Sequence, residues 1–146
     1  MSLTLEAMRA GVAARCVTIS GWTESPYPYE QFRQTTNLDL SSTFAVGVPE
    51  LSAEPDRQRA TEGVLTLADI RVAFAQKMKP KEKVASYGLG LEAGRALVKA
   101  LLTDASPWPG ARHPVFVGLT GGVIETGEWF LGEARFTVQF RLDLTS

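Results

Sequence analysis

Cysteine and histidine are scarce in this sequence, and their scarcity excludes most thiol and metal chemistry. Cys16 is the only cysteine and His113 the only histidine among 146 residues. A single cysteine excludes an intrachain disulfide and a multi-cysteine zinc site, and it is compatible with a reducing compartment. No G-x-S-x-G or H-E-x-x-H motif occurs. We therefore predict no catalytic residues, no metal site and no enzymatic activity. A catalytic pair among the sixteen acidic residues is the alternative left open.

Excess charge and long apolar runs are also lacking. Fifteen Lys and Arg against sixteen Asp and Glu give a net charge of −1, so no overall field attracts the protein to nucleic acid or anionic lipid. No apolar run approaches the roughly 18 residues of a membrane helix. Glu6, Arg9 and Arg15 interrupt the first segment, unlike the apolar core of a signal peptide. We expect no membrane partner, no specific nucleic-acid binding and a cytoplasmic location before assembly.

What is present is the composition of an ordinary globular domain. The apolar fraction is 45% and the charged fraction 21%, close to globular averages. A chain of this length is near the commonest size of one domain, and it contains no internal repeat and no linker. We predict a single domain spanning residues 1–146.

Two segments have helical periodicity. Leu5, Met8 and Val12 are spaced by three and four residues, which predicts a helix over residues 3–15. Pro80 suits the first turn of a second helix. The apolar stripe of that helix, which predicts packing on a sheet, comprises Tyr87, Leu91, Gly94, Val98 and Leu101, widened by Leu97 and Leu102.

Alternation of apolar and polar residues predicts the strands. The final segment alternates most strictly, and glycines in the segment before it predict a bulge or bend there. Helix, strands, helix and strands in this order predict an α+β fold: a mainly antiparallel or mixed β-sheet with two helices packed on one face. The predicted strands cover residues 16–20, 44–48, 64–74, 115–125 and 134–144.

The segment from Gly88 to Ala93 matches the G-x-G-x-x-A pattern of dinucleotide-binding loops. That chemistry requires an apolar strand directly before the glycines. Here the preceding residues are rich in lysine. We therefore predict that no nicotinamide or flavin cofactor binds.

Three further segments are candidates for contact with a partner. Residues 21–42 interleave aromatic rings with prolines, and the rings either cap the core or contact a partner. Residues 50–62 are charged and turn-like, as at a hairpin tip. The lysines of residues 77–83 form either a solvated corner or a contact with an acidic partner or nucleic acid. The candidate interface residues are Trp22, Tyr27, Tyr29, Phe32, Glu54, Asp56, Arg57, Arg59, Lys77, Lys79, Lys81 and Lys83.

The order of these elements resembles one known family. A helix, a strand, an aromatic loop and long strands come first. The segment Lys79-Pro80-Lys81-Glu82-Lys83-Val84-Ala85-Ser86-Tyr87 then leads into a helix, and the strand Phe136 to Leu144 closes the chain. This resembles the tail terminator family of tailed phages and gene transfer agents, also called tail completion or minor tail protein U-like proteins. The resemblance spans most of the chain.

The resemblance implies a structural virion protein with no active site and no cofactor. Such a protein forms a hexameric ring on the end of the finished tail tube, stops tube polymerisation and presents a surface to the head-side connector. Its implied partners are further copies of itself, the tail tube protein and the head–tail connector protein. Its implied location is the virion tail, after assembly in the host cytoplasm. The alternatives are another tail or neck component, such as a head–tail joining or tube protein, and a small-molecule-binding α+β module.

Overall fold

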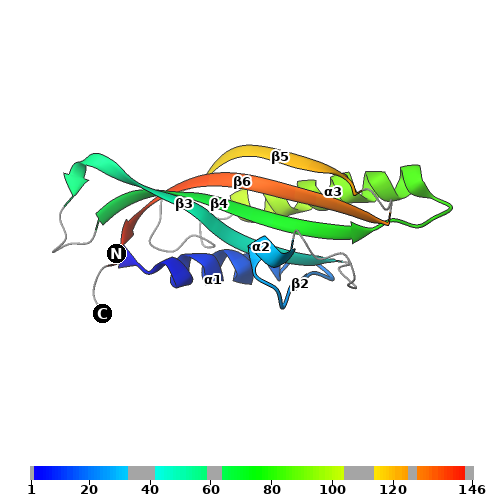
Figure 1. Ribbon diagram of the computed structural model, residues 1–146, viewed down its shortest axis with the longest axis horizontal. Coiled ribbons are helices and arrows are strands. Elements are labelled where there is room, and N and C mark those ends of the chain that lie inside the picture. Colours follow the sequence, from blue (N-terminus) through cyan, green and yellow to red (C-terminus); the bar gives the residue numbers. More distant parts are fainter. Residues whose placement is uncertain (1, 33–41, 59–63, 104–113, 125–127, 144–146) are drawn as a thin grey trace.

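One mixed β-sheet runs through the molecule and positions every other element (Figure 1). The computed structural model describes residues 2–32, 42–58, 64–103, 114–124 and 128–143. The three long central strands are antiparallel neighbours in the order β3-β4-β6, and they span Thr43–Gln58 in β3, Val64–Lys77 in β4 and Trp129–Leu142 in β6.

Shorter strands complete the two edges of this sheet. On one side, β2 (Thr23–Glu24) pairs in parallel with the first residues of β3. On the other side, β5 (Val115–Val123) pairs antiparallel with most of β6, and β1 (Ser2–Leu3) pairs in parallel with the end of β6. The chain therefore has β5 at one edge and β3 with β2 at the other.

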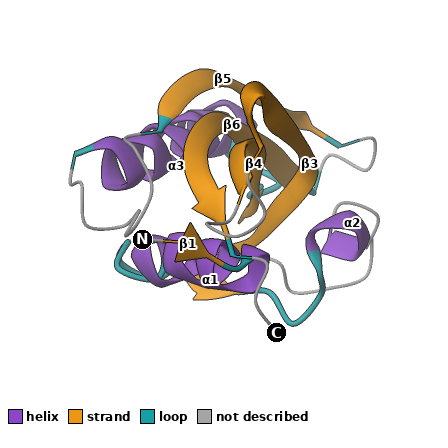
Figure 2. Ribbon diagram, turned by 90° about the vertical axis from the view of Figure 1, so that its left-hand side faces the viewer, coloured by secondary structure: helices purple, strands orange, loops and turns teal. Residues whose placement is uncertain are grey.

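Helices lie on both faces of the sheet, with the two long helices on one face and the short one on the other. The two long helices, α1 (Leu5–Cys16) and α3 (Lys83–Leu102), pack on one face and enclose the main core. The short helix α2 (Tyr29–Phe32) packs on the opposite face (Figure 2). The predicted α+β class with two helices on one face is confirmed, and α2 is an addition that lies within the predicted aromatic loop.

The strict alternation in the sequence corresponds to the main core. Phe136, Val138 and Phe140 of β6 are all at most 2% exposed, as the alternation over residues 134–144 predicted for its apolar face. The β4 residues that share this face are Ala68, Ile70, Val72 and Phe74, each at most 1% exposed. Both predictions are confirmed for the described residues. The final strand starts at Trp129, five residues earlier than predicted.

The predicted strand over residues 16–20 is wrong. Helix α1 continues through Cys16, and the amide of Val17 donates to the carbonyl of Ala13 at 3.1 Å. Val12 and Cys16 are both fully buried, because residues four apart lie on one face of a helix. A short run of alternating residues at a helix end is compatible both with the two-residue period of a strand and with the 3.6-residue period of a helix. Here packing against the sheet favours the helix.

The predicted turn-like segment after Pro49 is also wrong over its first part. Strand β3 continues to Gln58 and stays paired with β4. Its two prolines, Pro49 and Pro55, fall within two register irregularities, where the absence of a proline amide does not interrupt the ladder. The remainder of that predicted segment, residues 59–62, lies outside the described residues. His113 lies outside them as well.

Glycines let α3 lie close to the sheet. The buried side of α3 consists of Ser86, Gly90, Gly94, Leu97 and Leu101. Tyr87 and Leu91 were predicted on that side, but they are 40% and 47% exposed. A Cβ atom on Gly90 would lie 2.5 Å from the ring of Phe130, so the ring occupies the space that a side chain would need.

A matched pair of substitutions tests this close approach. Gly90→Ala should lower the free energy of unfolding by about 1–3 kcal/mol, because the methyl group overlaps Phe130. Gly88→Ala is the control in the same helix, where a Cβ meets nothing within 4 Å. It should raise stability by up to ~1 kcal/mol through helix propensity alone. Urea unfolding of both variants measures the difference, and equal effects would contradict the packing role of Gly90.

Candidate assembly surfaces

Strand β5 forms an exposed apolar edge of the sheet. Its nine residues, VFVGLTGGV, contain no charge and no proline. Val115 is 64% exposed and Val117 60%. One edge of β5 pairs with β6, and no strand within the described ranges pairs with the other. Its only irregularity is a register shift between Phe116 and Gly118, which confirms the predicted bulge.

The apolar character of β5 continues onto the first turns of α3. Met78, Val84, Tyr87 and Val123 line a hollow of about 270 Å³ together with Lys83. Val84 is 88% exposed. We call β5 and this hollow the β5 surface.

Four lysines form a basic corner beside the β5 surface. Lys77 ends β4, Lys79 and Lys81 lie in the turn that follows, and Lys83 begins α3. All four side chains are exposed. They do not share one strand face, because β4 ends before the turn. The carboxylate of Glu82 lies 3.9 Å from Lys79 Nζ, and Glu128 is also close, because its carbonyl accepts from the amide of Met78 at 2.8 Å.

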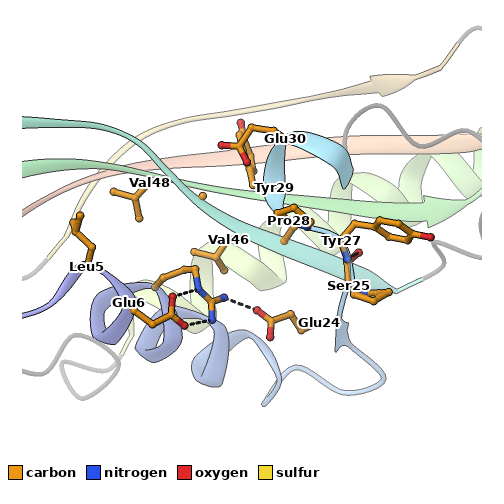
Figure 3. Close-up of a pocket in the computed structure, with 14 residues that line it drawn as sticks. Leu5, Glu6, Glu24, Ser25, Tyr27, Pro28, Tyr29, Glu30, Val46 and Val48 are labelled. Carbon is orange, nitrogen blue, oxygen red and sulfur yellow. Dashed lines mark hydrogen bonds and ion pairs between the residues drawn. The ribbon is translucent and has the colours of Figure 1, made fainter.

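A groove of about 560 Å³ lies along the opposite edge of the sheet (Figure 3). Its walls come from the start of α1, from residues 24–30 and from residues 45–48 of β3. The pairing between β2 and β3 ends at Phe44. Beyond Phe44, no described strand pairs with this edge of β3. We call this space the Arg9 groove.

Arg9 is the one cation that lines the groove, together with three glutamates. Its guanidinium donates to Glu6 at 2.7 and 2.9 Å and to Glu24 at 2.7 Å. The hydrogen bond to Glu6, and then that to Glu24, raise the pKa of Arg9, while partial burial opposes them. The arginine therefore stays charged, and Glu30 adds a further acidic group at the rim.

A buried ionic network fixes α2 to the outer face of the sheet. Glu133 of β6 is 4% exposed. It accepts a hydrogen bond from Tyr29 Oη at 2.5 Å and one from Arg135 Nε at 3.2 Å, and Arg71 Nη1 lies 3.7 Å away. The ring of Tyr29 lies over Gly47, where a Cβ would come within 2.5 Å of it. Arg71 also donates to Asp69, which raises the pKa of Arg71.

The aromatic residues predicted as an interface are mostly core. Trp22 is 8% exposed, Tyr29 7% and Phe32 fully buried. Their rings pack against the sheet, so this chain does not present them on its surface, and the alternative that they cap the core fits the geometry. Tyr27 is half-buried and lines the Arg9 groove.

The charged residues predicted as an interface divide into two groups. The four lysines lie together at the basic corner. Glu54, Asp56 and Arg57 lie in β3, but their side chains are outside the described part of the structure, and Arg59 is outside it altogether.

Sequence reasoning missed the most exposed part of the candidate site. Val115 and Val117 were assigned to a strand but not to an interface, and Arg9 and Glu24 were not singled out. The signal was present in β5, because a nine-residue strand without charge or proline is unusual at an exposed sheet edge. What hid it was the sheet order, which the sequence alone did not give.

Two residue types bear on metal and thiol chemistry in the part of the chain that the structure describes, the possible metal ligands and Cys16. No group of three or more His, Cys, Asp or Glu side chains there could hold a metal ion. Burial raises the pKa of the Cys16 thiol to about 12, so this thiol is unreactive. Gly88 and Gly90 lie inside α3 rather than at its start. No described helix is long and apolar enough to cross a membrane.

Comparison with known proteins supports the fold. No protein-family model matches the chain, and no curated protein matches it by sequence. A solved structure described as the virion of a native gene transfer agent particle contains a similar chain. The two are 11% identical with a TM-score of 0.62, over 91% of this chain and 93% of that one. This likeness shows a shared fold over nearly the whole length of both chains.

The Tyr29 hydroxyl should stabilise the ionic network measurably. Tyr29→Phe keeps the ring over Gly47 but removes a hydrogen bond to a buried carboxylate. We expect it to lower the free energy of unfolding by about 1.5–3 kcal/mol. Tyr27→Phe, at a half-buried ring on the groove, should change it by less than about 0.5 kcal/mol. Chemical denaturation gives both values, and a loss below about 0.5 kcal/mol for Tyr29→Phe would contradict the role of its hydroxyl.

Proposed function

We propose that this protein is a structural virion subunit of the tail terminator type, which forms a ring on the end of a tail tube. The observation that carries the proposal is the fold shared with a chain of a gene transfer agent virion over 91% of this chain and 93% of that one. The likeness covers nearly all of both chains and is not confined to one segment of either.

The surface of the molecule supports an assembly role. Subunits of a closed ring contact one another head to tail, so each needs two different patches. This chain has the β5 surface on one edge of its sheet and the Arg9 groove on the other. Neither patch requires a ligand or a catalytic group.

A tube subunit is the nearest alternative, because unpaired sheet edges serve polymers as well as rings. The two roles differ in what happens after one ring has formed. A terminator remains a discrete ring and blocks the tube end, whereas a tube subunit continues to add rings. The joining of tube to head-side connector belongs to the proposed terminator role.

Tube length tests the proposed function. Purified protein is added to tail tube protein of the same particle during tube polymerisation, and tube lengths are measured by electron microscopy. We expect tubes to stop growing, with one ring of about six copies on the capped end. Denatured protein and bovine serum albumin serve as controls. Unlimited growth in the presence of folded protein, or its incorporation along the whole tube, would contradict the terminator role.

A further inference from the structure

Within its own nine residues, strand β5 lacks most of the devices that normally keep a sheet edge from pairing. Soluble proteins protect exposed edges with lysine, proline, short strands or covering loops. β5 is nine residues long, without charge or proline, and its valines are more than half exposed at Val115 and Val117. The register shift between Phe116 and Gly118 is the one protective irregularity within the strand itself. An edge of this kind is a template for another strand.

The sheet offers a complementary edge within the same chain. Beyond Phe44, β3 has no described strand partner on the side of the Arg9 groove. From Ala45 to Val48 this edge contains no proline and lines the groove. Ala45, Val46 and Gly47 are buried there and Val48 is half-buried, so Val48 is the most accessible residue of this edge. Pro49 then ends the run of available amides.

Strand direction favours pairing between these two edges. β5 is antiparallel to β6, β6 to β4, and β4 to β3, so β5 runs opposite to β3. Rotation of a second copy about an axis along the strands keeps these directions. It brings β5 of one copy beside β3 of the next as an antiparallel pair, which continues the sheet.

Register places particular residues at the same height on the two edges. Val115 pairs with Thr137, Thr137 with Asp69, and Asp69 with Glu50. At the other end of β5, Val123 pairs with Phe130, and Phe130 pairs with Gln76 of β4. Gln76 directly follows Ala75, which pairs with Thr43 at the start of β3. The basic corner beside Val123 is therefore level with the end of β3 where Glu24 pairs with Phe44.

Charge is complementary between the two edges. The basic corner holds four lysines and Glu82, and Glu128 lies beside it, with its carbonyl accepting from the Met78 amide at 2.8 Å. Four lysines and these two glutamates give a net charge of +2. The groove is lined by three glutamates and Arg9, a net charge of −2. Opposite charges on two different patches favour a head-to-tail contact between copies.

The geometry points to one contact: β5 of each copy pairs antiparallel with residues 45–48 of β3 in the next copy, and the basic corner meets the acidic rim of the Arg9 groove. The occupant of each groove is thus a second copy of this chain. The inference rests on the proposed ring, since it specifies the surfaces through which that ring closes.

Cysteine cross-linking locates the contact. Val115→Cys and Glu50→Cys are combined in one chain. Within one copy the two edges are three strand spacings of ~4.8 Å apart, which is roughly 14 Å. A bismaleimide linker shorter than this separation can join them only between copies. The native Cys16 is buried and should not react with the linker. We expect a ladder of dimers, trimers and larger species on denaturing gels.

Single-cysteine and displaced variants are the controls. Val115→Cys alone and Glu50→Cys alone should give no cross-link. Val17→Cys combined with Glu50→Cys should give none either, because Val17, which is 52% exposed, lies after α1 and outside the proposed contact. Dimers from Val115→Cys alone would show two-fold pairing of β5 with β5 and would overturn the inference. An equal ladder from the Val17 variant would overturn it as well.

Charge reversal tests the second half of the contact. Lys79→Glu with Lys83→Glu makes the corner acidic, and Glu24→Lys with Glu30→Lys makes the groove basic. Each double variant alone should associate roughly tenfold more weakly in sedimentation. An equal mixture should recover association, because each altered patch then meets an oppositely charged one. Failure of the mixture to recover, with both variants folded by circular dichroism, would overturn the charge pairing.

These outcomes separate the inference from the proposed function. If the protein caps tubes but gives no ladder either free or on tube ends, the contact is wrong and the terminator role stands. A ladder without any effect on tube length supports the contact and counts against the terminator role. If the copies cross-link only to the tube protein, the occupant of the groove is that protein and the inference fails.

Discussion

The ladder between β4 and β6 is the constraint on which the rest of the structure depends. Fourteen consecutive residue pairs, from Val64 with Leu142 to Lys77 with Trp129, align these strands without a register shift. Because side chains alternate across a strand, this one register assigns each residue of both strands to a face. The apolar set faces α1 and α3, and Glu133 and Arg71 face α2. A slip by one residue would bury the charges in the main core.

Aromatic rings that pack against glycines fix the neighbouring elements in position relative to β4 and β6. Phe74 of β4 lies against Gly132 of β6 and near Gly94 of α3, and Phe130 lies against Gly90 and Gly121. Each ring fills the space of an absent side chain, so helix, central strands and β5 fit together in only one arrangement. On the outer face, Tyr29 over Gly47 has the same function. The sheet edges are therefore held by a rigid centre, which a surface for assembly requires.

Periodicity predicted the centre of the fold well and its margins poorly, for a physical reason. The segments of β4 and β6 have long alternating runs whose apolar face is buried along its length, so pattern and structure agree. In residues 16–20 the run is too short to distinguish a strand from a helix end, and contacts of Cys16 with the core decide. In residues 50–58 the prolines indicated a turn, yet pairing with β4 continues past two bulges. The candidate site depends on which strand lies at which edge, and that order comes from pairing between distant segments.

The two edges of the sheet also limit which assemblies are compatible with the chain. Two-fold pairing of β5 with β5 would cover one patch of each copy, stop at a dimer and leave both Arg9 grooves open. In an open head-to-tail chain both patches of every internal copy are covered, and the two ends of the chain leave one edge of each kind free. Only closure into a ring removes those last edges. Strand β2 covers only Thr43 and Phe44 of β3. The strand registers place the next residues of β3, up to Glu50, at the same height as β5. A contact confined to one height favours a flat closed ring over a rising helix of subunits.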